Sequence, residues 1–240
     1  MKRATGFVQR HPAIWPILGC VLFFLLIGSV TGSLDPTVVF TAARLATFAA
    51  LLGLAQMIVV TSGDGAIDLS QVYVLTLCAY ASTTLMDASP VLGFIAAVLI
   101  GGLAGLVNGL INIYLKIPAM VTTLATGYLY FSLILVGSSH MKVLPQQDFV
   151  ALVTGSVGPV SNQTILVAIV ALALAVVLYR TSYGKQLHAV GQNRTAAFLA
   201  GIPTGRVVIT AFVTGGLLSG LAGVIAAAGP GAARQGVGLG

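Results

Sequence analysis

The sequence predicts an all-α membrane protein: a polytopic transmembrane helical bundle of about seven spans. Three observations lead to this class. Hydrophobic residues fill 58% of the 240 positions and charged residues only 7%, whereas a soluble domain carries roughly 25% charged residues. Several apolar runs approach the ~20 residues that cross a bilayer as a helix. The 29 glycines are dispersed, which suits close helix packing in lipid, and a membrane β-barrel would show short alternating segments instead.

The expected spans follow from the apolar runs and the breaks between them. The first run follows a basic tail at residues 1–12. Its order of basic and then apolar residues also fits a signal peptide, but its length and the spans that follow favour a membrane anchor. No linker divides the spans, so we expect a single domain over residues 1–240. The seven spans are expected at residues 14–30, 40–60, 71–86, 91–113, 119–136, 163–179 and 207–228.

The distribution of basic residues predicts the orientation. If the N-terminus is cytoplasmic, the inner segments hold eight of the eleven Lys and Arg residues, the outer loops hold two (Lys142 and Arg234), and Arg44 is undecided. This asymmetry is what the positive-inside rule requires. We therefore expect a multi-pass protein of the cell inner membrane with a cytoplasmic N-terminus. The inner residues are Lys2, Arg3, Arg10, Lys116, Arg180, Lys185, Arg194 and Arg206.

Composition also narrows the chemistry. The net charge of +6 is explained by membrane topology, so no nucleic-acid partner is expected. The chain has five Asp and no Glu, and it lacks a phosphate-binding Gly-x-x-x-x-Gly-Lys-Ser/Thr loop and the common metal-binding motifs. We therefore predict no catalytic residue, no metal and no cofactor. The apolar runs also lack acidic residues, which argues against ion coupling.

A Gly/Asp-containing break separates the expected second and third spans at residues 61–70. Glycines such as Gly63 permit a departure from helix geometry, and Asp68 or Ser70 can cap the next helix. Two interpretations are open. The segment is either an ordinary capped cytoplasmic loop or a structured break beside a translocation path, since irregular backbone at membrane depth is tolerated only where it is buried or lines a cavity.

Three further patterns concern the helices themselves. Gly101, Gly105 and Gly109 share one helix stripe, as do Gly216 and Gly220, and such stripes let two helix backbones approach closely. The two segments resemble each other, which fits either an inverted repeat or a shared preference for small residues. Two interpretations are open for Asn108, Thr122, Thr123 and Thr126: they line a polar path, or the threonines bond to their own backbone, as threonines in helices more often do.

A polar, basic segment at residues 184–203 interrupts the apolar sequence late in the chain. Asn193 is a suitable N-cap, the alanines that follow favour helix, and Gly201 with Pro203 predicts its end. The expected helix has about two turns and is marginal alone. It therefore either docks on a cytoplasmic partner or lies at the membrane surface. Its candidate contact residues are Gly191, Asn193, Arg194, Ala196, Ala197 and Gly201.

Three ordered blocks now support a resemblance. Ile67-Asp68-Leu69-Ser70, the block from Gly105 to Thr123-Leu124 and the polar segment resemble motifs of the ribose-type, monosaccharide ABC transporter permeases. This resemblance implies a permease without its own ATPase site, working with cytoplasmic ABC ATPase subunits, a second permease subunit (the same or different) and an extracytoplasmic sugar-binding protein. Residues 180–206 would then form the cytoplasmic coupling loop.

The chain departs from that family pattern at three places. Asp64 interrupts the glycines of the break, Arg194 stands where the family often has Glu, and the family continues with several more spans after a Gly-rich segment such as residues 229–240. We therefore expect a shortened permease that imports a monosaccharide or similar small polar solute. The alternatives are an ATP-independent secondary transporter or channel, and a truncated permease remnant that transports nothing.

Overall fold

The structure is a computed structural model that describes residues 14–32, 36–137 and 146–228. The basic tail at residues 1–12, the Gly-rich segment 229–240 and the residues Lys142 and Arg234 lie outside the described residues. The chain divides into two compact units, residues 1–45 and 46–240. The described part of the first unit contains α2 (Ile14–Thr31) and α3 (Pro36–Leu45). The expectation of a single domain stays a prediction.

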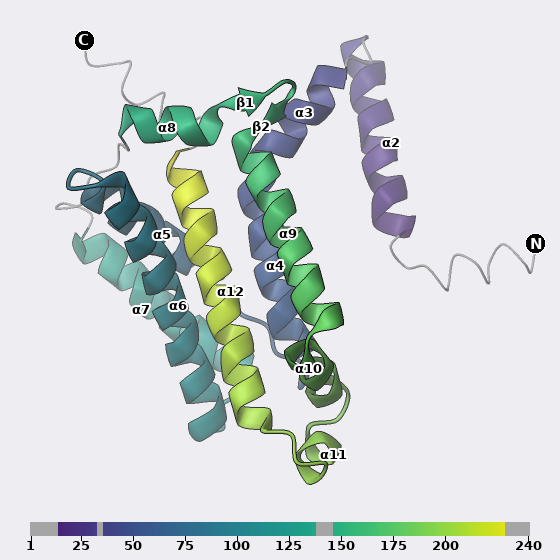
Figure 1. Ribbon diagram of the computed structural model, residues 1–240, viewed down its shortest axis with the longest axis vertical. Coiled ribbons are helices and arrows are strands. Elements are labelled where there is room, and N and C mark those ends of the chain that lie inside the picture. The colour runs from purple at the N-terminus through teal and green to yellow at the C-terminus, as the bar shows by residue number, and fades with distance from the viewer. Residues whose placement is uncertain (1–13, 33–35, 138–145, 229–240) are drawn as a thin grey trace, which may run out of the picture. The chain divides into compact units, whose positions relative to one another are not determined.

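The second unit is a helical bundle (Figure 1). It confirms the all-α class, and its only strands in the described residues are the two-residue pair β1 (Ser156–Val157) and β2 (Val160–Ser161). Its helices are α4 (Thr47–Thr61), α5 (Gln71–Leu85), α6 (Pro90–Tyr114), α7 (Ala119–Gly137), α8 (Gln147–Thr154), α9 (Asn162–Arg180), α10 (Ser182–Gln192), α11 (Arg194–Leu199) and α12 (Thr204–Ala227).

Four of the described helices, α6, α7, α9 and α12, are long and apolar enough to cross a membrane. A fifth span results if α3 and α4 are counted together, although the helix predicted at residues 40–60 is interrupted at Ala46. Neither Pro nor Gly marks that position. Helix α5 has 15 residues, fewer than a straight span requires. The span count of seven and the cytoplasmic N-terminus therefore stay predictions.

Helix α12 forms the centre of the bundle. In the most apolar 18-residue stretch of α12, 67% of the residues are buried, whereas the corresponding share in the other three long helices is 17 to 33%. It packs against α4, α5 and α6, and its Phe212 is fully buried in a cluster with Leu51 and Ile58 of α4. The apolar side chains of α7 and α9 are largely exposed, as expected for helices that face lipid.

The glycine stripes explain the closest helix contact. A Cβ atom on Gly101 would lie 2.9 Å from the Cα of Gly220, and one on Gly105 would overlap the carbonyl oxygen of Phe212. The backbones of α6 and α12 therefore touch where both helices carry glycine, as the four-residue spacing predicts. The two similar segments are thus the two sides of one contact.

Candidate functional site

The break between α4 and α5 begins at the surface of the bundle and then enters it. Gly63, Asp64 and Gly65 all have positive φ angles, of 85, 53 and 63°. Three successive residues in the left-handed region turn the chain sharply after α4. The chain then passes inward, since Asp68 is only 7% exposed and Ser70 is fully buried. This burial favours the interpretation as a structured break, and its place beside a translocation path stays a prediction.

Buried polar side chains hold this inward segment. Asp68 Oδ1 accepts hydrogen bonds from the backbone N–H of Ser70 at 2.8 Å and from the Ser70 hydroxyl at 2.6 Å. Asn108 of α6 donates to the Ser70 Oγ at 2.9 Å. In turn, Thr126 of α7 donates to Asn108 Oδ1 at 2.6 Å. One chain of hydrogen bonds thus joins the break to two helices.

A second set of bonds anchors the same segment by its backbone. The hydroxyl of Thr123 accepts from the N–H of Leu69 at 3.0 Å and lies 3.2 Å from the carbonyl oxygen of Ile67. With their amides oriented to satisfy their neighbours, Gln56 and Gln71 pair with each other, and Gln56 also bonds to both backbone groups of Asp68 at 3.2 Å. We define Gln56, Asp68, Ser70, Gln71, Asn108, Thr123 and Thr126 as the polar network.

The capping prediction for α5 holds for Asp68, whose Oδ1 accepts the N–H of Ser70 at the start of the helix, and is wrong for Ser70. Ser70 is the N-cap residue, but its side chain makes no capping hydrogen bond, because its hydroxyl is engaged by Asp68 and Asn108. Thr122 is buried beside the network and lies 3.5 Å from the carbonyl oxygen of Ile117. Thr126 was named only with the polar path, and Gln56 and Gln71 were not among the predicted site residues. Their signal is an amide or hydroxyl side chain within or beside an apolar run, where each such group needs a partner.

The predicted short helix is present as α11. The Asn193 side chain accepts the N–H of Ala196 at 2.9 Å, which confirms the N-cap. At the other end, Gly201 has a φ of 84°, and the N–H groups of Gly201 and Ile202 bond to the carbonyl oxygens of Phe198 and Ala197. This pattern is a Schellman motif, the helix end that a C′ glycine favours.

Helix α10 precedes α11 and was not predicted. Leu187 and Val190 are buried on one of its faces, and Thr181 caps its first turn by accepting the N–H of Gly184. Tyr183 of α10 has a buried hydroxyl without a hydrogen-bond partner in the described part of the chain. Burial raises the pKa of Tyr183 to about 12, so the phenol stays neutral at ordinary pH.

The predicted coupling residues have different environments. Ala197 is buried against the bundle, while Ala196 is exposed. Phe198 and Leu199 are 67% and 79% exposed, so α11 presents an apolar surface outward. A Cβ atom on Gly63 would lie 2.7 Å from both the Cα and the carbonyl oxygen of Gly191, so α10 touches the break backbone to backbone.

Arg194 pairs within the chain. Its Nη1 lies 2.9 Å from Asp64 Oδ2, and both residues line a cavity of about 510 Å³ together with Lys116 and the first residues of α7 and α12. Figure 1 shows α10, α11 and the beginning of α12 at one end of the bundle. The described basic residues of this unit lie at that end, in agreement with the charge asymmetry of the sequence. They are Lys116, Arg180, Lys185, Arg194 and Arg206.

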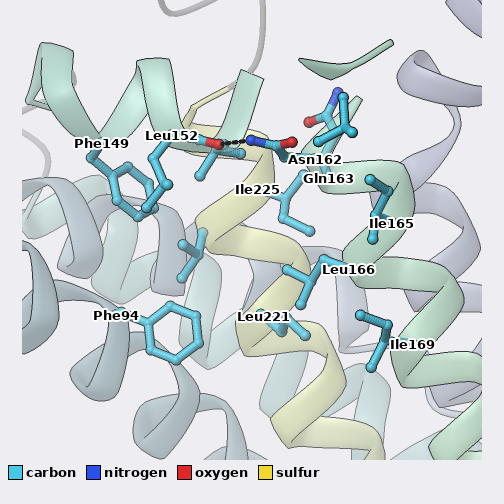
Figure 2. A pocket seen from close by; sticks show the side chains of 13 residues that line it. Phe94, Phe149, Leu152, Asn162, Gln163, Ile165, Leu166, Ile169, Leu221 and Ile225 are labelled. Atoms are coloured by element: carbon cyan, nitrogen blue, oxygen red, sulfur yellow. Dashed lines mark hydrogen bonds between the residues drawn. The ribbon is translucent and has the colours of Figure 1, made fainter. Parts of the chain in front are cut away.

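A second cavity, of about 490 Å³, lies toward the other end of the bundle (Figure 2). Helices α6, α8, α9 and α12 supply its walls, among them Phe94, Phe149 and Leu221, and the lining is almost entirely apolar. Asn162 faces it but donates to the carbonyl oxygen of Leu152 at 2.7 Å. This cavity does not offer the convergent polar groups that a small polar solute requires.

Comparisons with known proteins agree with this architecture. Residues 38–240 match the family described as the permease component of the branched-chain amino acid transport system. An L-arabinose ABC transporter permease of Azospirillum brasilense is 32% identical over 93% of this chain and 69% of its own length. An autoinducer 2 import system permease of Yersinia enterocolitica is 30% identical over 91% and 61%, and a D-allose transport system permease of Escherichia coli is 29% identical over 94% and 72%.

The chain therefore belongs to this family of ABC transporter permeases, as the three sequence blocks indicate. It is a multi-pass protein of the inner membrane. The chain spans between 61 and 72% of the length of these three relatives. No solved structure matches it significantly.

Proposed function

We propose that the chain acts as the membrane-spanning permease subunit of an ATP-driven importer. The observation that carries this proposal is α11, a short helix capped at both ends that presents Phe198 and Leu199 outward at the basic end of the bundle. A helix of six residues gains little from its own hydrogen bonds. A partner surface that buries its exposed apolar face is the simplest reason to maintain it.

The partner that fits is a cytoplasmic ABC ATPase, which would supply the ATP hydrolysis that this chain has no motif to perform. A second permease subunit and an extracytoplasmic binding protein complete the proposed assembly. Its mechanism is alternating access: ATP-driven closure of the ATPase subunits displaces α11, and ligand and nucleotide shift the populations of inward-facing and outward-facing states.

For the solute we propose a monosaccharide or a similar small polar molecule. The three relatives above are named for arabinose, allose and autoinducer 2, whereas the family description names branched-chain amino acids. Our candidates for the translocation path or for the helix break beside it remain Gly63, Asp68, Ser70, Asn108, Thr122 and Thr123. The support for this role is that Asp68 and Ser70 are buried in irregular backbone, which membrane proteins tolerate only where it is enclosed by protein or lines a cavity.

The test is reconstitution of the permease with its ATPase subunits and binding protein in lipid vesicles. We expect ATP-dependent uptake of labelled L-arabinose or D-allose and none of L-leucine. Uptake that persists without the ATPase would contradict the proposal, and so would a permease that fails to retain an ATPase on purification.

Substitutions in α11 sharpen this test. Proline at Ala196 removes the N–H that Asn193 binds, and a charge at Ala197 would be buried, so either change should uncouple ATP hydrolysis from uptake. Removing an apolar anchor by Leu199→Ala should weaken ATPase binding about tenfold. The matched control is Leu152→Ala, since Leu152 is 68% exposed on α8, toward the opposite end of the bundle.

A further inference from the structure

Asp64 and Arg194 each stand at a position where the local backbone disfavours that type of residue. Asp64 has a φ of 53° between two glycines with positive φ, where a third glycine would be strained less. Arg194 is the first residue of α11, and a cation at a helix N-terminus opposes the helix dipole. Their side chains meet at 2.9 Å. The ion pair therefore gives one reason why the chain has Asp at position 64 and Arg at position 194.

The pair has a geometric context that makes it more than an isolated surface contact. Close to it, Gly191 and Gly63 touch backbone to backbone, with no room for a Cβ atom on either residue. These two contacts lie on opposite sides of Asn193, the N-cap of α11. The start of α11 is thus fastened to the break at two successive points.

The same break continues directly into the polar network. Only three residues separate Asp64 from Asp68, and Asp68 and Ser70 connect through Asn108 to Thr126. A displacement of α11 therefore reaches the interior of the bundle through a short stretch of backbone that is held at both ends.

From this arrangement we infer that Arg194 is a positioning residue, which fastens α11 to the break through Asp64 and does not serve as a charge that contacts the ATPase. This inference rests on the proposed function of α11. When the ATPase displaces α11, the Asp64–Arg194 pair makes the break follow. Without the pair, α11 moves independently of the break, and less of the movement that ATP hydrolysis drives reaches the interior of the bundle.

The pair itself is tested first in the purified permease, without any partner. Asp64→Asn, Arg194→Gln and the combined variant form a double-mutant cycle read by the midpoint of thermal unfolding. Because the side chains are 60% and 30% exposed, we expect each single change to lower the midpoint by about 1–4 °C. The double variant should add little to either. Fully additive effects would overturn the inference. This readout does not depend on an ATPase, so it stays informative even if the proposed function fails.

The transmitting role is tested in the reconstituted transporter. Uptake per ATP hydrolysed should fall about two- to fivefold in Asp64→Asn and in Arg194→Gln, and the exchanged pair Asp64→Arg with Arg194→Asp should recover most of it. The matched control is Lys185→Gln, an exposed cation of α10, which should leave the ratio unchanged. If Arg194→Gln weakens ATPase retention while Asp64→Asn has no effect, Arg194 contacts the ATPase and the inference is wrong.

Discussion

The hydrogen bond between Thr126 and Asn108 gives the sharpest test of the polar network. The two atoms lie 2.6 Å apart, and the Asn108 side chain is fully buried. Asn108→Leu removes this bond and the bond to Ser70, while Thr126→Val removes only the first. Asn108→Leu leaves no hydroxyl without a partner, because Thr126 can turn to the carbonyl oxygens of its own helix at 3.1 and 3.3 Å and Ser70 keeps Asp68. Thr126→Val leaves the buried Asn108 Oδ1 without its donor, so its cost should lie toward the upper end of the range for one such bond.

The expected loss of stability follows from the number of hydrogen bonds that each variant removes. Hydrogen bonds between membrane helices contribute about 0.6 kcal/mol on average and about 1.7 at most. We therefore expect Asn108→Leu to lower the free energy of unfolding by about 1–3 kcal/mol and Thr126→Val by about 0.6–1.7 kcal/mol. The double variant should fall short of the sum by the energy of the shared bond, again about 0.6–1.7 kcal/mol.

The assay is reversible unfolding of the purified protein in mixed detergent micelles, followed by helical circular dichroism. Asn112→Leu combined with Thr126→Val is the control, because Asn112 bonds to the carbonyl oxygen of Ile117 instead. That pair should be additive within about 0.5 kcal/mol. If the Asn108 and Thr126 variants are equally additive, the network does not act as a connected unit and the reasoning is refuted.

Three further substitutions test single contacts. Gly105→Leu should reduce the free energy of unfolding by about 1–3 kcal/mol or more, because its side chain would enter the backbone of α12; Gly53→Leu in α4, with open space at its Cβ position, is the control, and equal losses would contradict the close approach. Asn193→Ala should cost α11 about 1 kcal/mol, seen as faster amide hydrogen exchange at Ala196, while Asn193→Ser should retain most of the protection. Tyr183→Phe removes an unpaired buried hydroxyl and should leave stability unchanged or raise it by up to about 1 kcal/mol; a clear loss would reveal a partner for that hydroxyl.

The sequence predicted the long helices closely, because each depends on a local property. Helices α6, α7, α9 and α12 begin and end within three residues of the expected bounds, since hydropathy and the flanking Gly, Pro and charged residues mark those bounds directly. The caps of α11 were also predictable, because Asn193 and Gly201 act on backbone groups a few residues away.

Contacts between distant positions were not predictable in the same way. The pairing of Asp64 with Arg194 joins residues 130 positions apart, and each residue alone looks like a departure from the family pattern. The inward course of the break depends on contacts with Thr123 and Asn108. These contacts cannot be predicted from the Gly and Asp residues of the break itself. Helix α10 was missed because only one face of it is apolar, so it does not stand out among longer apolar runs.

The central position of α12 has a consequence for how this protein is made. Ribosomes deliver the chain from the N-terminus, and α12 follows every helix that it packs against. Until it enters the membrane, the glycines of α6 and the buried face of α4 have no neighbour to cover them. Helices α5, α6 and α7 already contact one another before α12 arrives, but the faces of α4 and α6 that α12 covers stay open to lipid or an insertion chaperone until it inserts. A slow or failed insertion of this one helix would leave the earlier ones exposed to membrane proteases.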